Sequence, residues 1–185
     1  TTAPTAKLHV QGNIKAQLDN ISGASDVNMR YNNGTQVIGY DLAEYFETTE
    51  DVEGGDVLVI SSKEDRKLEK SRRPYDTAVA GVVSGSPAIL FEGSTLEIAP
   101  LPGGFVKGTK PPLTLAGRIL CKVTNENGPI GRGDLLTTSS VPGHAMKATD
   151  KEKAWGAIVG KALEGFSGGP TGESTGKIMV LLTLQ

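Results

Sequence analysis

Cysteine and histidine are nearly absent from this chain, and their scarcity excludes several kinds of chemistry. The 185 residues include one cysteine, Cys121, and two histidines, His9 and His144. A single cysteine cannot form a disulfide within the chain, and three such residues fall short of the four ligands of a structural zinc site. Cys121 stands in an alternating apolar stretch, which predicts a small buried side chain and not a nucleophile. We therefore expect neither a metal nor a cofactor.

The chain also carries little net charge and no long apolar run. The formal charge is -2 at pH 7, so there is no basic field to attract nucleic acid, and we expect no such partner. No apolar run approaches the roughly 20 residues of a membrane-spanning helix, so we expect no membrane insertion. The sequence opens without a signal-peptide pattern, and we expect it to begin within a domain.

Short apolar runs rich in Val, Ile, Leu and Thr recur from Val52 onward, separated by Gly, Pro, Asn or Ser clusters. This pattern predicts β-strands, and no segment has a helical period over three turns. The sequence therefore predicts an all-β domain over residues 37–185, built as a barrel or as interlocked hairpins. The expected strands are Asp56–Ser61, Lys67–Ser71, Ala78–Ser84, Ala88–Phe91, Thr95–Ala99, Leu113–Thr124, Asp134–Thr138, Ala145–Ala148, Trp155–Glu164 and Gly176–Leu184.

A weak internal repeat runs through this domain, with units at about 52–91 and 130–184. Gly55 and Gly133 each precede an aspartate and a strand, and a second glycine follows at a matching offset, Gly81 and Gly160. A Gly-Asp turn supplies a positive φ before a strand, and a glycine inside a strand marks a bulge or a close backbone approach. We predict positive φ at the first pair and equivalent strand positions for the second.

Residues 1–36 are thin and polar, with only weak alternation of apolar residues. A ribbon of this kind cannot bury enough surface to order itself, and the simplest partner is another copy of the chain. We predict an extended stalk that makes the protein a homo-oligomer, with residues 5–18 at the subunit contact.

Several conspicuous motifs have simple structural interpretations. The mixed-charge run Lys63–Arg73 predicts an exposed hairpin, and Ser84–Pro87 predicts a turn between strands. The tripeptide Arg132–Asp134 matches an integrin-binding motif, but the same turn recurs without arginine before Asp56. Trp155 is the single tryptophan, and we expect it to anchor the core.

Asp41 and Glu44 are the acids whose spacing suggests chemistry. The stretch Leu42–Glu47 is the one helical candidate, and in a helical turn residues i and i+3 share a face. The two carboxylates could then converge, raising one pKa for general acid or base catalysis. The alternative, which we favour, is a helix cap in which Asp41 is the N-cap and Glu44 lies at N3.

Two stretches resemble known fibre proteins. Thr1–Gly12 resembles a segment of phage tail-fibre and bacterial surface-fibre shafts. Asp41–Glu47, followed by Val79–Ile89, is similar to the C-terminal intramolecular-chaperone domains of phage neck appendages and tail fibres. The likeness covers about residues 37–90. It implies a trimeric β-rich domain that assembles a fibre and, in some members, cuts itself off.

In self-cutting members the cut precedes the aspartate of this motif, which here is the Tyr40–Asp41 bond. Glu44 is then the catalytic candidate, with Asp41 beside it. Those members have a small hydroxyl residue where this chain has Tyr40, so we expect the chain to remain whole.

The sequence thus predicts a structural and assembly module at an extracellular or virion surface, and the resemblance implies that it is a trimer. Two alternatives stay open. One is an autoproteolytic chaperone that cuts before Asp41, and the other is a fibre tip that binds a host-surface receptor or glycan.

Overall fold

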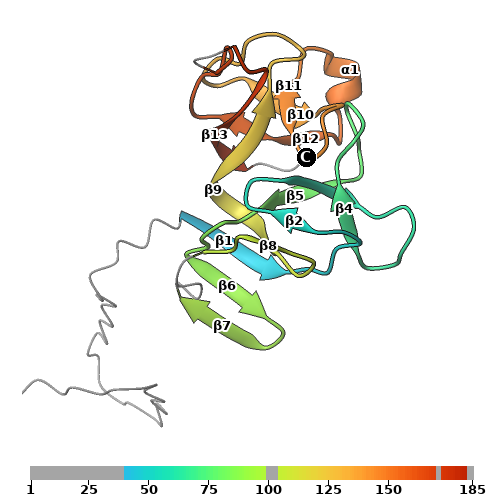
Figure 1. Cartoon of the computed structure of the whole chain (residues 1–185), viewed down its shortest axis with the longest axis vertical. Coiled ribbons are helices and arrows are strands. Elements are labelled where there is room, and N and C mark those ends of the chain that lie inside the picture. The colour runs from blue at the N-terminus through green and yellow to red at the C-terminus, as the bar shows by residue number, and fades with distance from the viewer. Residues whose placement is uncertain (1–39, 99–103, 170–171, 183–185) are drawn as a thin grey trace, which may run out of the picture. The chain divides into compact units, whose positions relative to one another are not determined.

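The computed structural model describes residues 40–98, 104–169 and 172–182, which form a nearly all-β domain, as predicted (Figure 1). The predicted stalk at residues 1–36 and its subunit contact at residues 5–18 lie outside the described residues. The predicted strands of the domain each correspond to an observed one, with ends that differ by a few residues.

Five strands close a β-barrel in the second half of the chain. In order around the barrel they are β11 (Ala145–Lys147), β10 (Leu135–Thr138), β12 (Ile158–Ala162), β13 (Thr175–Leu182) and β9 (Pro112–Thr124). A parallel bridge between Ala145 and Val123 joins β11 to the far end of β9 and closes the barrel. The other pairings are antiparallel. Closure leaves these strands without free edges.

The first half of the chain repeats this arrangement around the near end of β9. Its strands run in the order β4 (Leu68–Lys70), β3 (Val57–Ile60), β5 (Val79–Val83), β9 and β1 (Tyr40–Tyr45). A parallel bridge between Thr48 and Leu68 brings the chain that follows β1 back to β4. The long strand β9 therefore belongs to both halves, as Figure 1 shows.

The remaining elements are short. β2 (Val52–Glu53) pairs with β8 (Lys107–Gly108) in a separate sheet. The hairpin of β6 (Ile89–Glu92) and β7 (Thr95–Ile98) extends the large sheet beyond β1, with β6 parallel to β1. The helix α1 (Lys151–Ala154), which the sequence did not predict, is a single turn capped by the Asp150 side chain.

The predicted Gly-Asp turns have the same geometry in both halves. Gly55 has φ 96° and Gly133 has φ 86°, so both predictions of a positive φ are confirmed. The amide of Gly55 donates to the Val83 carbonyl at 2.8 Å, and the amide of Gly133 donates to the Ala162 carbonyl at 2.7 Å. The turn before β3 is thus bonded to the end of β5, and the turn before β10 is bonded to the end of β12.

The second pair of glycines also occupies equivalent strand positions. Gly81 lies opposite Leu58, Gly160 lies opposite Leu136, and each pairing shifts register at the next step. A Cβ at Gly160 would collide with the Leu181 carbonyl oxygen. These glycines therefore permit a close approach between strands at a bulge, as their placement inside strands predicted.

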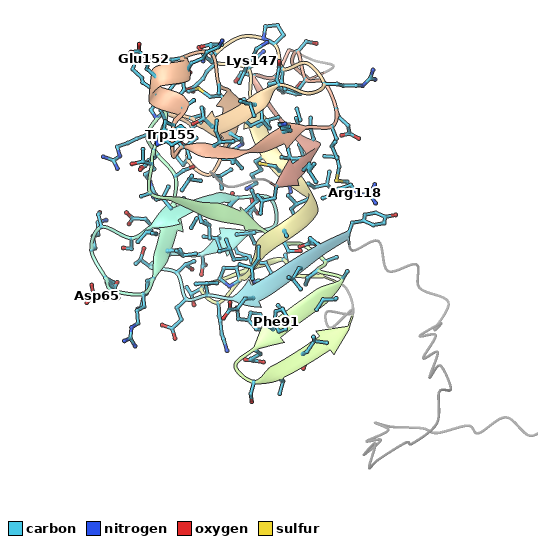
Figure 2. The ribbon with its side chains drawn as sticks, turned by 180° about the vertical axis from the view of Figure 1, so that it is seen from behind. Asp65, Phe91, Arg118, Lys147, Glu152 and Trp155 are labelled. Carbon is cyan, nitrogen blue, oxygen red and sulfur yellow. The ribbon has the colours of Figure 1, made fainter. Side chains whose placement is uncertain are left out.

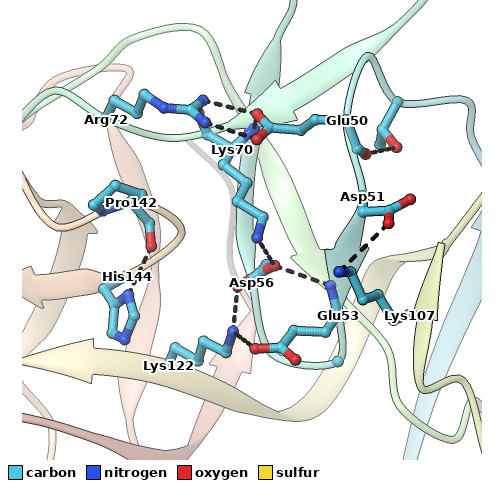
Figure 3. A network of polar contacts seen from close by, with 12 residues as sticks. Glu50, Asp51, Glu53, Asp56, Lys70, Arg72, Lys107, Lys122, Pro142 and His144 are labelled. Atoms are coloured by element: carbon cyan, nitrogen blue, oxygen red, sulfur yellow. Dashed lines mark hydrogen bonds and ion pairs between the residues drawn. The ribbon is translucent and has the colours of Figure 1, made fainter. Parts of the chain in front are cut away.

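A buried charge network holds the first Gly-Asp turn (Figure 3). Asp56 is fully buried and accepts the Glu53 amide at 2.9 Å. Its carboxylate also forms ion pairs with Lys70 at 3.1 Å and Lys122 at 2.6 Å, and Lys122 contacts Glu53 as well. Burial lowers the pKa of Lys122, but its bonds to Asp56 and Glu53 outweigh that effect and raise it.

The second turn carries a more exposed version of this network. Asp134 accepts the Gly131 amide at 2.6 Å and pairs with Lys147 at 2.8 Å. Lys147 lies opposite Leu136 in the strand register, as Lys70 lies opposite Leu58. The repeat therefore extends to the charged partner.

The buried core includes two clusters: the larger lies mainly in the second half of the domain but includes Val57 and Val82 of the first, and the smaller lies mainly in the first half. Cys121 lies in the larger cluster, where burial raises the pKa of its thiol to about 12. The prediction of a small buried side chain at Cys121 is confirmed. The larger cluster comprises Val57, Val82, Ile119, Cys121, Val123, Ile130, Leu136, Ala145, Val159, Ala162, Ile178, Val180 and Leu182; the smaller comprises Val52, Leu58, Leu68, Val83 and Leu113.

Trp155 is not part of either cluster. Its side chain follows α1 and is 89% exposed, so the prediction that it anchors the core is wrong (Figure 2). Ala154 and Ala157 on either side of it are buried instead. The helical turn, which the sequence pattern did not reveal, directs the small residues inward and the tryptophan outward.

Candidate functional site

Asp41 and Glu44 lie on strand β1, so the predicted helical turn at Leu42–Glu47 is wrong. β1 pairs with β9 on one side and β6 on the other, and these contacts override the local preference of the segment. Side chains alternate along a strand, so residues i and i+3 point to opposite faces. The two carboxylates do not converge, and the helix-cap alternative is wrong as well.

The Asp41 carboxyl is buried between neighbouring strands. Thr114 donates its hydroxyl to Asp41 Oδ2 at 2.9 Å. Burial raises the pKa of Asp41, while the nearby hydroxyls of Ser84 and Thr114 act in the opposite direction. The Ser84 hydroxyl is itself fully buried and lacks a hydrogen bond of ordinary geometry within the described residues. Asp41 and its two hydroxyl neighbours therefore form a buried polar group beside the start of β1.

The Tyr40–Asp41 peptide is held tightly in the sheet. Gly117 lies opposite Asp41, and a Cβ there would collide with the Tyr40 carbonyl oxygen. The Ala88 amide donates to the Asp41 carbonyl at 3.0 Å. Glu44 is four residues from Tyr40, which on a strand is about 13 Å. The Glu44 carboxylate of the same chain is therefore beyond hydrogen-bond reach of this peptide.

A cavity of about 580 Å³ opens beside this peptide. Its lining includes Tyr40, Asp41 and Ser84 on one side and Arg118 and Leu120 of β9 on the other. The Arg118 guanidinium lies 4.1 Å from the centre of the Tyr40 ring. An arginine stacked in this way is attracted by the ring and is held in one orientation.

Glu44 points to the opposite face of β1 from Asp41, where its neighbours are apolar. It lies opposite Leu113 of β9 and Phe91 of β6, and Phe91 lies opposite Leu96 of β7. Residues in register share a face, as do residues two apart on one strand, so Leu42 lies on this face too. Leu96 is 55% exposed, so this apolar surface is open to solvent at its outer edge.

Glu44 differs from the other acids that are wholly or partly buried in the described residues, because it has no hydrogen bond or ion pair. The others bond to a lysine, an arginine or a hydroxyl: Asp41, Glu50, Asp56, Glu69, Asp76, Asp134 and Asp150. The prediction that Glu44 would cap a turn or form a salt bridge at the joint is therefore wrong for a single chain.

The outer face of the barrel carries an exposed apolar surface, which we call the β9–β13 stripe. It consists of Leu120, Met179, Leu181 and Leu163, with Tyr40 and Arg118 at its end. Leu120 is 51% exposed, and Leu163 and Leu181 are each more than a third exposed. Leu120 lies opposite Met179 and Arg118 opposite Leu181, while the Leu163 amide donates to the Met179 carbonyl. The stripe therefore crosses β9, β13 and the residue that follows β12.

Sequence reasoning had identified Asp41 and Glu44 but not Arg118, Ser84 or Thr114. Arg118 and Leu120 could have been found from alternation, because Ile119 and Cys121 must face the barrel interior and leave both outside. No sequence signal placed Ser84 or Thr114 beside Asp41, since they lie 43 and 73 residues away and meet it through strand pairing.

The described residues include no cluster of three or more histidine, cysteine, aspartate or glutamate side chains that could hold a metal ion. In the same part of the chain, no helix has the length and apolarity needed to cross a membrane.

The chain matches no protein-family model, and comparison with curated proteins and with solved structures found no significant match. The resemblance to fibre chaperone domains therefore depends on its short motifs alone, and it stays a prediction.

Proposed function

We propose that this protein is a structural and assembly module of an extracellular or virion fibre, and that it works as a homotrimer. The observation that carries the proposal is the β9–β13 stripe. Its half-exposed leucines are neighbours on adjacent strands, whereas the exposed apolar residues of a monomer are normally scattered singly.

Association would bury this stripe. Fully burying a leucine side chain contributes about 2 kcal/mol, so the stripe offers several kcal/mol to a subunit contact. A stable interface removes about 800 Å² from solvent on each partner, and four large side chains supply a central part of that area. Homo-oligomers with closed symmetry are the usual outcome when one chain carries such a surface.

Native mass spectrometry and light scattering at micromolar concentration test the proposal. We expect three chains per particle. Leu120→Ser combined with Leu181→Ser should weaken association by at least tenfold while leaving the circular dichroism spectrum unchanged. A wild-type chain that stays monomeric well above micromolar concentration would refute the proposal.

A self-cleaving module is the second candidate, and the buried Asp41 favours it. Its carboxyl has a raised pKa and adjoins the Tyr40–Asp41 bond and the hydroxyls of Ser84 and Thr114. Hydrolysis there would leave a carboxylate on Tyr40 and an amine on Asp41. Against this candidate, Glu44 of the same chain cannot reach the bond, and Gly117 packs against its carbonyl.

Intact-mass measurement separates the two candidates. We expect the purified chain to keep its full mass during prolonged incubation, with Glu44→Gln behaving as the wild type does. A fragment that begins at Asp41 would establish the self-cleaving function instead, and its loss in Glu44→Gln would show that Glu44 takes part.

A further inference from the structure

We propose that Glu44 of one chain forms an ion pair with Arg118 of a second copy, joining the apolar surface around β1, β6 and β7 to the neighbour's β9–β13 stripe. The inference rests on the proposed assembly function and names the two surfaces that meet. The partner is a second copy of this chain.

The first support is the unpartnered Glu44 carboxylate. A charge that is partly withdrawn from water and lacks a partner is costly, because apolar neighbours cannot replace its hydration. The side chains that share its face are Leu42, Phe91 and Leu113. Within the described residues, the other acids of comparable burial have a partner, so a cation from outside the chain accounts for this exception.

The second support is Arg118, whose surroundings complement those of Glu44. It is exposed, stacks on Tyr40 and forms no ion pair within the described residues. Its side chain borders the leucines of the stripe and the 580 Å³ cavity. Arginine presents a planar fork of donors that matches a carboxylate, and stacking on a ring orients that fork before binding.

The third support is that the stripe carries more basic than acidic residues. On the β6–β7 hairpin, Glu92 already pairs with Lys110 at 2.6 Å, and Glu97 shares the face of Leu90, so Glu44 is the acid that remains available on the face of Phe91. The stripe carries Lys161 and Lys177 beside Arg118, and its one acidic neighbour among the described residues, Glu164, accepts the Met179 amide at 2.9 Å. This excess of basic residues favours contact with the surface that carries Glu44 over contact between two stripes.

A single chain cannot make this pair. Arg118 lies opposite Tyr40, four residues along β1 from Glu44, which corresponds to about 13 Å. Figure 2 labels Phe91 on the β6–β7 hairpin and Arg118 on β9, well apart from each other. A contact between two different surfaces of identical chains builds a ring when the rotation closes, which agrees with a trimer.

A double-mutant cycle tests the pair. Glu44→Lys and Arg118→Glu should each weaken association at least tenfold in sedimentation analysis, because each places like charges in contact. The double variant restores opposite charges in reversed order and should associate within threefold of the wild type. Glu97→Lys is the matched control. It makes the same charge change on the hairpin, but its side chain shares the face of Leu90 and not of Phe91, and it should change association less than threefold.

The outcomes separate this inference from the proposed function. A monomeric wild type refutes both. If the wild type is an oligomer but the two substitutions act additively, the ion pair is refuted and the assembly function stands. The same holds if an acid substituted for Lys161 restores the association of Glu44→Lys. Thermal unfolding of each variant verifies folding, and Glu44→Gln with Arg118→Gln repeats the cycle with neutral residues if a charge reversal prevents folding. In that cycle, a coupling below threefold contradicts the pair.

Discussion

Substituting Asp56 by asparagine should destabilise the domain far more than the same change at Asp134, although the two residues occupy equivalent turns. Asparagine keeps an oxygen that can accept the amide of Glu53 or Gly131, so the turn itself is preserved. The substitution removes the negative charge that faces the lysines.

The magnitude follows from burial. The Asp56 side chain is 1% exposed, and its partners Lys122 and Lys70 are 12% and 21% exposed. Removing one member of a buried ion pair costs about 3 to 5 kcal/mol, and here Lys70 loses its carboxylate while Lys122 keeps only Glu53. The Asp134 side chain is 25% exposed and Lys147 is 33% exposed, so water can solvate that lysine. We expect a cost of about 1 kcal/mol or less at that turn.

Urea unfolding followed by circular dichroism measures both costs, with all proteins at one chain concentration because association contributes to stability. The two variants share a charge change and a turn geometry, so the difference between them isolates the buried network. Equal losses within about 0.5 kcal/mol would refute the reasoning, as would a loss below about 1 kcal/mol for Asp56→Asn.

Three further predictions use the same unfolding assay. Gly143 and Gly128 both have positive φ, but a Cβ at Gly143 would lie 2.7 Å from Asp56 Oδ1 while Gly128 has open space. Alanine should therefore cost about 1 kcal/mol at Gly128 and at least about 1 kcal/mol more at Gly143; equal costs would contradict the packing there. Burial raises the pKa of Asp41 above 3.8, so the folded state binds this proton more tightly than the unfolded state, and the contribution of Asp41 to stability declines as pH rises through its folded pKa. Asp41→Asn should thus gain stability over the wild type only above about pH 4, and a difference that does not vary with pH would count against this cause. Trp155→Ala should change stability by less than about 0.5 kcal/mol, since the side chain is 89% exposed; a loss above 2 kcal/mol would place the indole in a packed contact.

The sequence by itself determined ten of the strands and the geometry of the two Gly-Asp turns. Both depend on local features. Period-two alternation decides which residues of a strand face inward, and a glycine before an aspartate selects a positive φ wherever it occurs. Gly55 and Gly133 could therefore be assigned without knowing which strands pair. The same alternation predicted correctly that Cys121 is buried.

Only the tertiary structure decided the state of β1, the exposure of Trp155 and the surroundings of the two acids. The motif around Asp41 carries residues that suit a helix cap, and it becomes a strand because β9 and β6 offer hydrogen bonds on both sides. That pairing turns Asp41 toward Thr114 and leaves Glu44 on the other face without a partner. Contacts between segments more than 40 residues apart fix these surroundings, and local sequence carries no record of them.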